Sequence, residues 1–300
     1  MAKILVTGGT RFVSRCVAES FRDKGFDVYV LNRGNSPSPE GVTLIKSDRH
    51  EIGDKLRGMH FEAVIDVCAY TEADVEDLKK ALDDECTYIL VSSSAVYPEW
   101  EQQPFAEDAK RDLNMFWRTY GTDKIDAEDM ALSSFEDAYI IRPPYIYGEG
   151  NNLYREAFVF DCAEQDRRFF LPGEGDMKLQ FFHVEDLCRF IEVILKKKPS
   201  ERIYNVGNSE TVSIREWVEA CYRVLGKTPS FVNVTSGIEQ RLYFPFYNYE
   251  YILDVTRMNE LLPDTIPLEE GLRSSYKWYQ ENRDQVNIKP LISYIEEELT

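Results

Sequence analysis

The sequence predicts an α/β fold in which a doubly wound parallel sheet is joined to a smaller α/β part. In the first half, short apolar runs rich in β-branched residues alternate with helical patterns. The first run leads through a glycine turn into a helix, and near residue 150 the pattern changes to aromatic clusters in loops. Strands that alternate with helices and are apolar on both faces are typical of parallel sheets with right-handed crossovers.

The first predicted unit is a strand, a turn and a helix. Residues Lys3–Thr7 read as the strand, and Val13, Val17 and Phe21 then recur at helical spacing until Gly25 ends the run. Further runs rich in β-branched and aromatic residues predict strands at 27–31, 42–46, 63–67, 87–91, 138–141 and 202–206. Helical segments separate most of them, as a doubly wound sheet requires.

Composition and charge limit the classes of function. The chain has 300 residues, 43% of them hydrophobic, which suits two folded domains, expected at 1–150 and 151–300. It carries 53 acidic and 35 basic residues, a net charge of −18 that disfavours nucleic acid and membrane partners. The basic run Lys196–Lys198 is explained as the end of a helix before Pro199.

The N-terminal residues, the lengths of the apolar runs and the cysteine pattern suggest an ordinary intracellular protein. The N-terminal residues enter a strand without a signal-peptide pattern, and no apolar run reaches the length of a membrane helix. We therefore expect a cytoplasmic protein. The six cysteines are scattered and form no CxxC pair, so we expect reduced thiols and no metal site.

The segment TGGTRFVSR, at residues 7–15, predicts a phosphate-binding turn. Gly8 and Gly9 stand between the first strand and the first helix, where backbone N–H groups and a helix N-terminus bind a pyrophosphate in dinucleotide folds. Arg11 and Ser14 occupy the places of the later glycines of that pattern. A plain strand-to-helix glycine turn is the alternative, and Arg11 is a candidate partner for cofactor phosphates.

The end of the second predicted strand bears on the choice of cofactor. An enzyme that uses NAD usually has an acidic residue there for the ribose 2′-hydroxyl. This chain has Asn32 and Arg33 instead, and an arginine suits a 2′-phosphate. The sequence therefore favours NADP over NAD.

A serine-rich strand end and a Tyr–Lys pair form the candidate catalytic group. Ser92 and Ser93 follow the fifth strand, and Tyr120 and Lys124 would share one face of the next helix. A lysine ammonium beside a tyrosine stabilises its phenolate, so Tyr120 could transfer a proton while Ser93 holds the reacting oxygen. A tyrosine and a lysine on an exposed helix face can have the same spacing. The prediction of a catalytic pair therefore depends on the order of the motifs along the chain: phosphate loop, serines, then Tyr–Lys pair.

On these motifs the chain resembles the extended short-chain dehydrogenase/reductases, the NAD-dependent epimerase/dehydratase family. Further matches are VIDVCAY at residues 64–70, RPPYIYG at 142–148, FHVEDL at 182–187 and YNVGN at 204–208. The resemblance implies a Rossmann domain to which residues 183–208 return, while the rest of 151–300 caps the substrate. It implies a helix-opening, structural role for His183 and allows a homodimer.

The resemblance also implies the roles of individual residues. The catalytic group would be Ser93, Tyr120 and Lys124, with Ser94 as the alternative if the register shifts by one. The following residues would contact the cofactor: Gly8, Thr10, Arg11, Phe12, Val13, Asn32, Arg33, Asp48, Arg49, Val67, Cys68, Ala69, Ser92, Tyr120, Lys124 and Pro143. Asp48 and Arg49 would flank the adenine.

The function that this resemblance implies is an NAD(P)-dependent epimerase-type reaction on a nucleotide sugar or a related hydroxyl or carbonyl substrate. Dehydratases of the family carry an Asp–Glu pair where this chain has Ser94 and Ala95, so elimination of water would lack its acid and base. The TGGTRF variant is also similar to a branch with members described as isoflavone-reductase-like and as chloroplast RNA-binding proteins. An NADPH-dependent reductase of a non-sugar carbonyl and an idle cofactor-binding or RNA-binding protein therefore stay open as alternatives.

Overall fold

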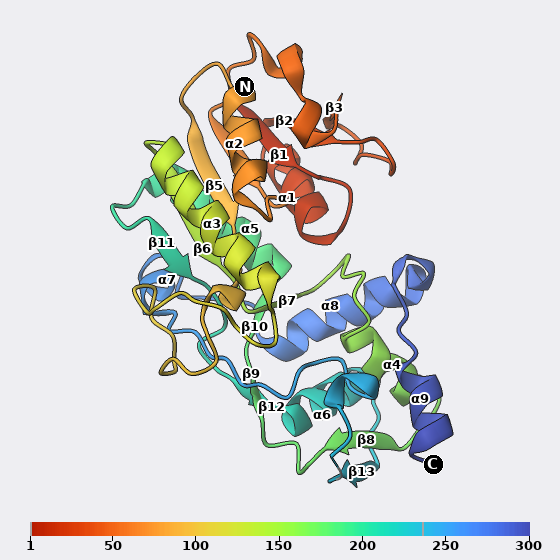
Figure 1. Ribbon diagram of the computed structural model, residues 1–300. Helices are drawn as coiled ribbons and strands as arrows, with labels where there is room; N and C mark the ends of the chain where they lie inside the picture. Colours follow the sequence, from red (N-terminus) through yellow and green to blue (C-terminus); the bar gives the residue numbers. More distant parts are fainter. Residues whose placement is uncertain (1, 236) are drawn as a thin grey trace.

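The computed structural model describes residues 2–235 and 237–300 and confirms the predicted fold class. Seven parallel strands form the central sheet in the order β11-β6-β5-β4-β1-β2-β3 (Figure 1). The strands are β1 (Lys3–Thr7), β2 (Asp27–Asn32), β3 (Thr43–Lys46), β4 (Ala63–Asp66), β5 (Thr87–Val91), β6 (Ala138–Arg142) and β11 (Ile203–Asn205). The chain winds outward from β1 in both directions, so the switch point lies between β1 and β4.

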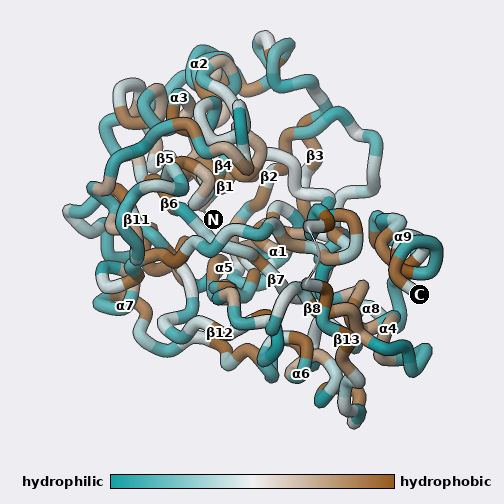
Figure 2. Tube along the Cα trace, turned by 60° about the horizontal axis from the view of Figure 1, so that its bottom comes forward, coloured by the Kyte–Doolittle hydropathy of each residue, from teal (hydrophilic) through white to brown (hydrophobic). Residues whose placement is uncertain are grey.

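A pair of helices covers each face of this sheet. Helices α1 (Phe12–Asp23) and α5 (Val184–Lys197) pack together on one face, and α2 (Glu72–Ala81) and α3 (Thr119–Ser134) on the other. Successive strand residues therefore enter different cores: Ile4 and Val6 join α1 and α5, whereas Leu5 joins α2 and α3. In Figure 2 the strands of the sheet are coloured largely as hydrophobic, as two covered faces require.

The remaining elements form the second part of the molecule. Its helices are α4 (Glu156–Glu164), α6 (Ile214–Val224), α8 (Leu268–Glu281) and α9 (Leu291–Glu298), whereas α7 (Thr256–Leu261) packs against β11 and α5 of the central-sheet part. Its strands are β7 (Tyr145–Tyr147), β8 (Phe169–Pro172), β9 (Lys178–Leu179), β10 (Phe181–His183), β12 (Val212–Ser213) and β13 (Phe231–Val234), paired as β10 with β7, β12 with β9 and β13 with β8.

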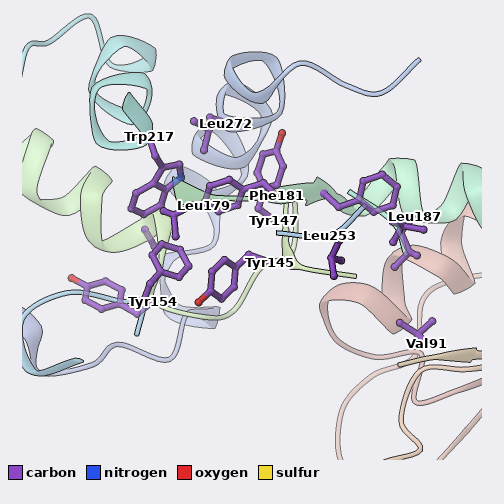
Figure 3. Packing of buried hydrophobic residues seen from close by; sticks show 14 of the residues in the cluster. Val91, Tyr145, Tyr147, Tyr154, Leu179, Phe181, Leu187, Trp217, Leu253 and Leu272 are labelled. Atoms are coloured by element: carbon purple, nitrogen blue, oxygen red, sulfur yellow. The ribbon is translucent and has the colours of Figure 1, made fainter. Parts of the chain in front are cut away.

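Aromatic packing holds this second part together. Phe181 and Trp217 stack with their ring centroids 5.8 Å apart, and Tyr145 packs beside Phe181 and Phe246 (Figure 3). The same cluster continues to Val91 of β5, so one core joins the sheet to the second part.

The end of β10 leads directly into α5, which lies on the central sheet. His183 is buried and caps α5, because its Nδ1 accepts a hydrogen bond from the backbone N–H of Glu185. β11 then pairs with β6, so the chain re-enters the central sheet after α4 and β8–β10. In the part of the chain that the structure describes, no helix has the length and hydropathy to cross a membrane.

Candidate active site

The glycine turn after β1 has a backbone that only glycine adopts readily. Gly8 and Gly9 have φ values of 85° and 78°, and a Cβ on Gly9 would lie 2.3 Å from Cγ1 of Val30. The Asn32 side chain holds the turn: its Nδ2 donates to the Gly8 carbonyl at 2.6 Å, and its Oδ1 accepts from the Gly34 N–H at 2.8 Å. Asn32, predicted as a cofactor contact, thus also supports the turn.

The two departures from the glycine pattern fit without strain. Arg11 has φ −141°, an extended conformation open to any residue, and the buried Ser14 hydroxyl donates to the Arg11 carbonyl at 3.0 Å. Helix α1 starts at Phe12 with no side-chain cap and no acidic residue in its first turn, and Arg11 is exposed beside it. Its first N–H groups are therefore available to an anion, so these residues fit a dinucleotide phosphate.

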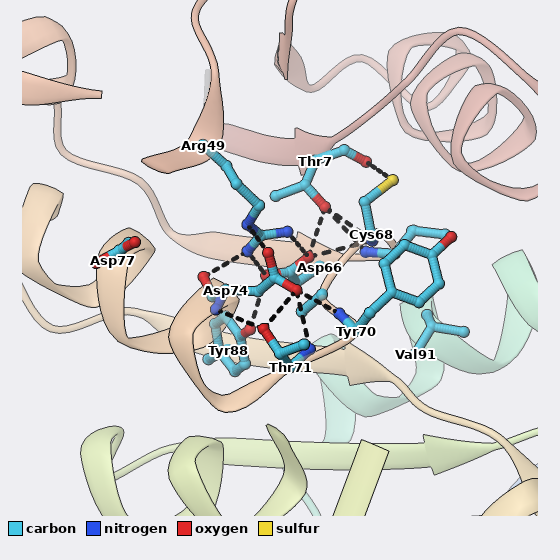
Figure 4. A network of polar contacts seen from close by, with 12 residues as sticks. Thr7, Arg49, Asp66, Cys68, Tyr70, Thr71, Asp74, Asp77, Tyr88 and Val91 are labelled. Atoms are coloured by element: carbon cyan, nitrogen blue, oxygen red, sulfur yellow. Dashed lines mark hydrogen bonds and ion pairs between the residues drawn. The ribbon is translucent and has the colours of Figure 1, made fainter. Parts of the chain in front are cut away.

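Arg49 belongs to a buried polar network between the ends of β1 and β4 (Figure 4). Its guanidinium donates to the Asp66 carboxylate at 2.8 Å and to the Asp74 carbonyl at 2.7 Å. Thr7 and Tyr88 also donate to Asp66, at 2.6 Å and 2.8 Å. Burial alone would raise the pKa of Asp66, but Arg49 and these hydroxyls hold it below its usual value. Arg49 was predicted to flank the adenine, and its guanidinium is already paired with carboxylates of the protein.

The other residues predicted for the adenine half lie at the carboxyl ends of β2 and β3. Arg33 is exposed, directly after β2. The Asp48 carboxylate follows β3 and accepts a hydrogen bond from the backbone N–H of His50 at 3.0 Å. Thr10 lines a hollow beside the glycine turn together with Arg11 and Phe12.

One cavity of about 420 Å³ collects most of the predicted site. It lies where the glycine turn, the ends of β4 and β5, the start of α3 and the segment after β6 meet. The predicted residues that line it are Arg11, Phe12, Val13, Val67, Cys68, Ser92, Ser93, Tyr120, Lys124 and Pro143. Ala69 contributes indirectly, through its carbonyl oxygen.

Tyr120 is in the first turn of α3, and a close approach brings it to the end of β5. A Cβ on the next residue, Gly121, would lie 2.3 Å from the Ala95 carbonyl oxygen, so the helix can approach this closely only with glycine there. Burial raises the pKa of Tyr120, while a hydrogen bond with Ser93 and the charge of Arg155 lower it. Ser93 is thus close to Tyr120, and both Ser93 and the alternative Ser94 line the cavity.

Lys124 shares the face of α3 with Tyr120 but reaches further into the protein. Its ammonium donates to the carbonyls of Ala69 at 2.7 Å and Val91 at 3.1 Å, and it lies 5.0 Å from the centre of the Tyr70 ring. Burial lowers the pKa of Lys124 to about 8, against the opposing effect of Asp66. The hydrogen bonds found among the described residues include none between Lys124 and Tyr120.

Ser92 lines the cavity, but its hydroxyl is already engaged within the protein. Its hydroxyl donates to Glu128 of α3 at 2.5 Å, and Glu128 forms a fully buried ion pair with Arg142 of β6 at 2.6 Å. Arg142 also donates to the Tyr97 hydroxyl at 2.7 Å. Burial opposes ionisation of Glu128, but Arg142 holds its pKa below the usual value. This network fixes α3 against the sheet and thereby positions Tyr120.

Several cavity residues were not predicted from the sequence. The cavity is also lined by Trp117, Tyr145, Asn152, Arg155 and Tyr251. Tyr145 lies within the RPPYIYG match and could have been inferred from it, and Trp117 precedes Tyr120 by one helical turn. Tyr251 ends the aromatic cluster at 243–251, a pattern that could have pointed to a ring-stacking surface, whereas Asn152 and Arg155 belong to no motif.

The comparisons with known proteins agree with this geometry. The family model "NAD dependent epimerase/dehydratase family" matches residues 4–207. The chain is 26% identical over 299 residues to the chloroplast stem-loop binding protein of 41 kDa b of Arabidopsis thaliana, covering 91% of this chain and 78% of that protein. It is 24% identical over 204 residues to the dTDP-D-glucose 4,6-dehydratase of Mus musculus, covering 65% of this chain but only 56% of that enzyme.

A similar solved structure is the dTDP-glucose 4,6-dehydratase from Bacillus anthracis in complex with NAD. Its TM-score is 0.77 at 20% identity, with 97% of this chain and 100% of that chain covered, which establishes the shared fold. The family match covers the sheet, the glycine turn and the Tyr–Lys pair, and it confirms the resemblance inferred from the motifs. The chain therefore belongs to the NAD-dependent epimerase/dehydratase family of enzymes.

Proposed function

We propose that this protein is an NAD(P)-dependent epimerase-type enzyme that acts on a nucleotide sugar. The observation that carries the proposal is the single cavity in which the glycine turn at the N-terminus of α1 meets Ser93, Tyr120 and Lys124. Its sugar-nucleotide relatives support the substrate class, and Ser94 and Ala95 leave it without the acid–base pair of a dehydratase.

The proposed chemistry assigns one task to each side chain. The nicotinamide, when bound, would take up a hydride from the sugar and return it. Ser93 would hydrogen-bond the reacting oxygen, and Tyr120 would accept and return its proton. Lys124, held by the carbonyls of Ala69 and Val91, would present its remaining donor to the cofactor ribose. Trp117 and Tyr251 would limit the access of water.

Incubation with NAD or NADP and a panel of UDP- and dTDP-linked sugars tests the reaction. Nuclear magnetic resonance should detect an epimer of one sugar without net change in cofactor absorbance, because an epimerase returns its hydride. Stoichiometric consumption of NADPH with a non-sugar ketone, and no conversion of any nucleotide sugar, would favour the reductase alternative. Tyr120→Phe is the control for adventitious activity.

The cofactor preference rests on Arg33 at the end of β2. We expect NADP(H) to bind more tightly than NAD(H) by about 1–3 kcal/mol, and nearer the lower figure because Arg33 is exposed. Arg33→Ala should remove the difference, whereas Arg57→Ala, which removes an exposed arginine elsewhere, should leave it unchanged. Calorimetric titration of both cofactors measures this, and equal affinities in the unaltered protein would contradict it.

We expect no specific binding of RNA, despite the similarity to a stem-loop binding protein. The basic run at the end of α5 is engaged within the protein: Lys196 pairs with Glu192, Lys197 donates to the Leu261 carbonyl and Lys198 pairs with Asp137. With a net charge of −18, the dissociation constant should be no lower than about 10⁻⁶ M near physiological salt. Anisotropy titration with a stem-loop and a single-stranded RNA measures it, and tighter, salt-sensitive binding would favour the RNA-binding alternative.

A further inference from the structure

Arg155 lies at the junction of two cavities. It immediately precedes α4 and lines the active cavity, and it also lines an adjoining cavity of about 890 Å³. Trp117, Tyr145 and Leu153 line both cavities as well. Arg155 is therefore placed where a substrate that extends from Tyr120 into the second part of the molecule would pass.

The guanidinium of Arg155 is held by aromatic rings and lacks a counter-ion. It lies 4.8 Å from the ring centre of Tyr145 and 5.7 Å from that of Phe246. In residues 2–235 and 237–300, no carboxylate lies within 4.0 Å of it, whereas Arg142 and Arg49 have such partners. Its hydrogen bond to the Ile146 carbonyl is long, at 3.5 Å. A half-buried cation of this kind favours a ligand that brings an anion.

The charge of the residues that line the active cavity also favours an anionic ligand. Among the described residues that line the active cavity, Arg11, Lys124 and Arg155 are cationic and none is acidic, although the chain has 53 acidic and 35 basic residues. Arg11 lies at the glycine turn, and Lys124 is held by two backbone carbonyls. Arg155 is thus the cation that remains for the substrate, and its charge reaches far enough to lower the pKa of Tyr120.

We propose that Arg155 selects acidic substrates by pairing with a carboxylate on the sugar ring, an inference that rests on the nucleotide-sugar function proposed above. The planar guanidinium matches a carboxylate through two parallel hydrogen bonds. The contact with the Tyr145 ring holds the guanidinium at the cavity wall, where Arg155 is a lining residue. Because Arg155 and Tyr120 line the same cavity, the carboxylate would lie close to the reacting carbon.

Two nucleotide sugars that differ in one group test this pairing. UDP-glucuronic acid carries a carboxylate where UDP-glucose carries a hydroxymethyl group, and both carry the same diphosphate. Calorimetric titration in the presence of saturating NAD, on a Tyr120→Phe background that prevents turnover, should show about tenfold or more tighter binding of UDP-glucuronic acid. Arg155→Gln should abolish this preference and Arg155→Lys should retain part of it. Arg223→Gln, which removes an exposed arginine paired with Glu269, should leave it unchanged.

The possible outcomes separate this inference from the proposed function. Equal affinity of the Tyr120→Phe protein for the two ligands, or a preference that survives Arg155→Gln, overturns the role of Arg155 alone. An equal loss of affinity for both ligands in Arg155→Gln would assign the residue to the diphosphate and also overturn the inference. Failure of both ligands to bind would overturn the nucleotide-sugar function together with it. Thermal unfolding of each variant verifies that it is folded.

Discussion

Replacement of Tyr120 by phenylalanine is expected to lower turnover by about 10²–10⁴-fold while leaving the affinity for NAD(P) unchanged. The substitution removes the hydroxyl group that would carry the proton but keeps the ring that packs against Trp117 and Tyr70. The glycine turn and the start of α1, which would hold the cofactor phosphates, lie outside the changed residue.

Steady-state kinetics on the substrate identified by the sugar panel, with calorimetric titration of the cofactor, measure both quantities. Tyr29→Phe is the matched control, because its hydroxyl contacts Asp27 at the start of β2, away from the cavity. Turnover within about threefold of the unaltered enzyme, well below the usual contribution of an acid–base group, would remove Tyr120 from the proposed mechanism.

Arg142→Met is expected to destabilise the protein by about 3–5 kcal/mol, because it leaves the Glu128 carboxylate buried without its main partner. Tyr97 and the Glu107 carbonyl would lose a donor at the same time. Urea denaturation followed by circular dichroism measures the free energy of unfolding.

Arg111→Met is the matched control for this effect. Arg111 contacts the same carboxylate at 3.0 Å, but its side chain is 26% exposed, so its loss should cost about 1 kcal/mol or less. The paired substitution Glu128→Leu with Arg142→Met should recover much of the lost stability, since no uncompensated charge remains. A loss below about 1 kcal/mol for Arg142→Met alone would contradict the importance of burial here.

The sheet could be predicted from the sequence because its strands are apolar on both faces. The predicted strand 87–91 became β5 with the same bounds, and 202–206 became the edge strand β11 at 203–205. Ser93 and Tyr120 could be placed in one cavity because parallel strands end at one edge and the helix after β5 begins there.

Other features depend on contacts between distant parts of the chain, which local patterns do not encode. Ser92 bonds to Glu128, 36 positions away, and Arg49 bonds to Asp66, 17 positions away. Lys124 was expected beside the Tyr120 hydroxyl, since one helical turn separates them. Its longer side chain instead reaches the carbonyls behind the cavity. Arg155 comes from a loop of the second part, and its position depends on how that part packs on the sheet.

The return of the chain to the sheet at β11 has a consequence for protein synthesis. About 60 residues separate β6 from β11, so a nascent chain that emerges N-terminus first exposes one open edge of β6 until residue 205 has left the ribosome. At about 5–20 residues per second, this interval lasts roughly 3–12 s. During it, the face of β6 that α5 later covers, including Tyr139 and Ile141, is also open to solvent. Chaperone binding and aggregation of stalled chains should therefore be greatest when the last residue to have left the ribosome lies between 142 and 205.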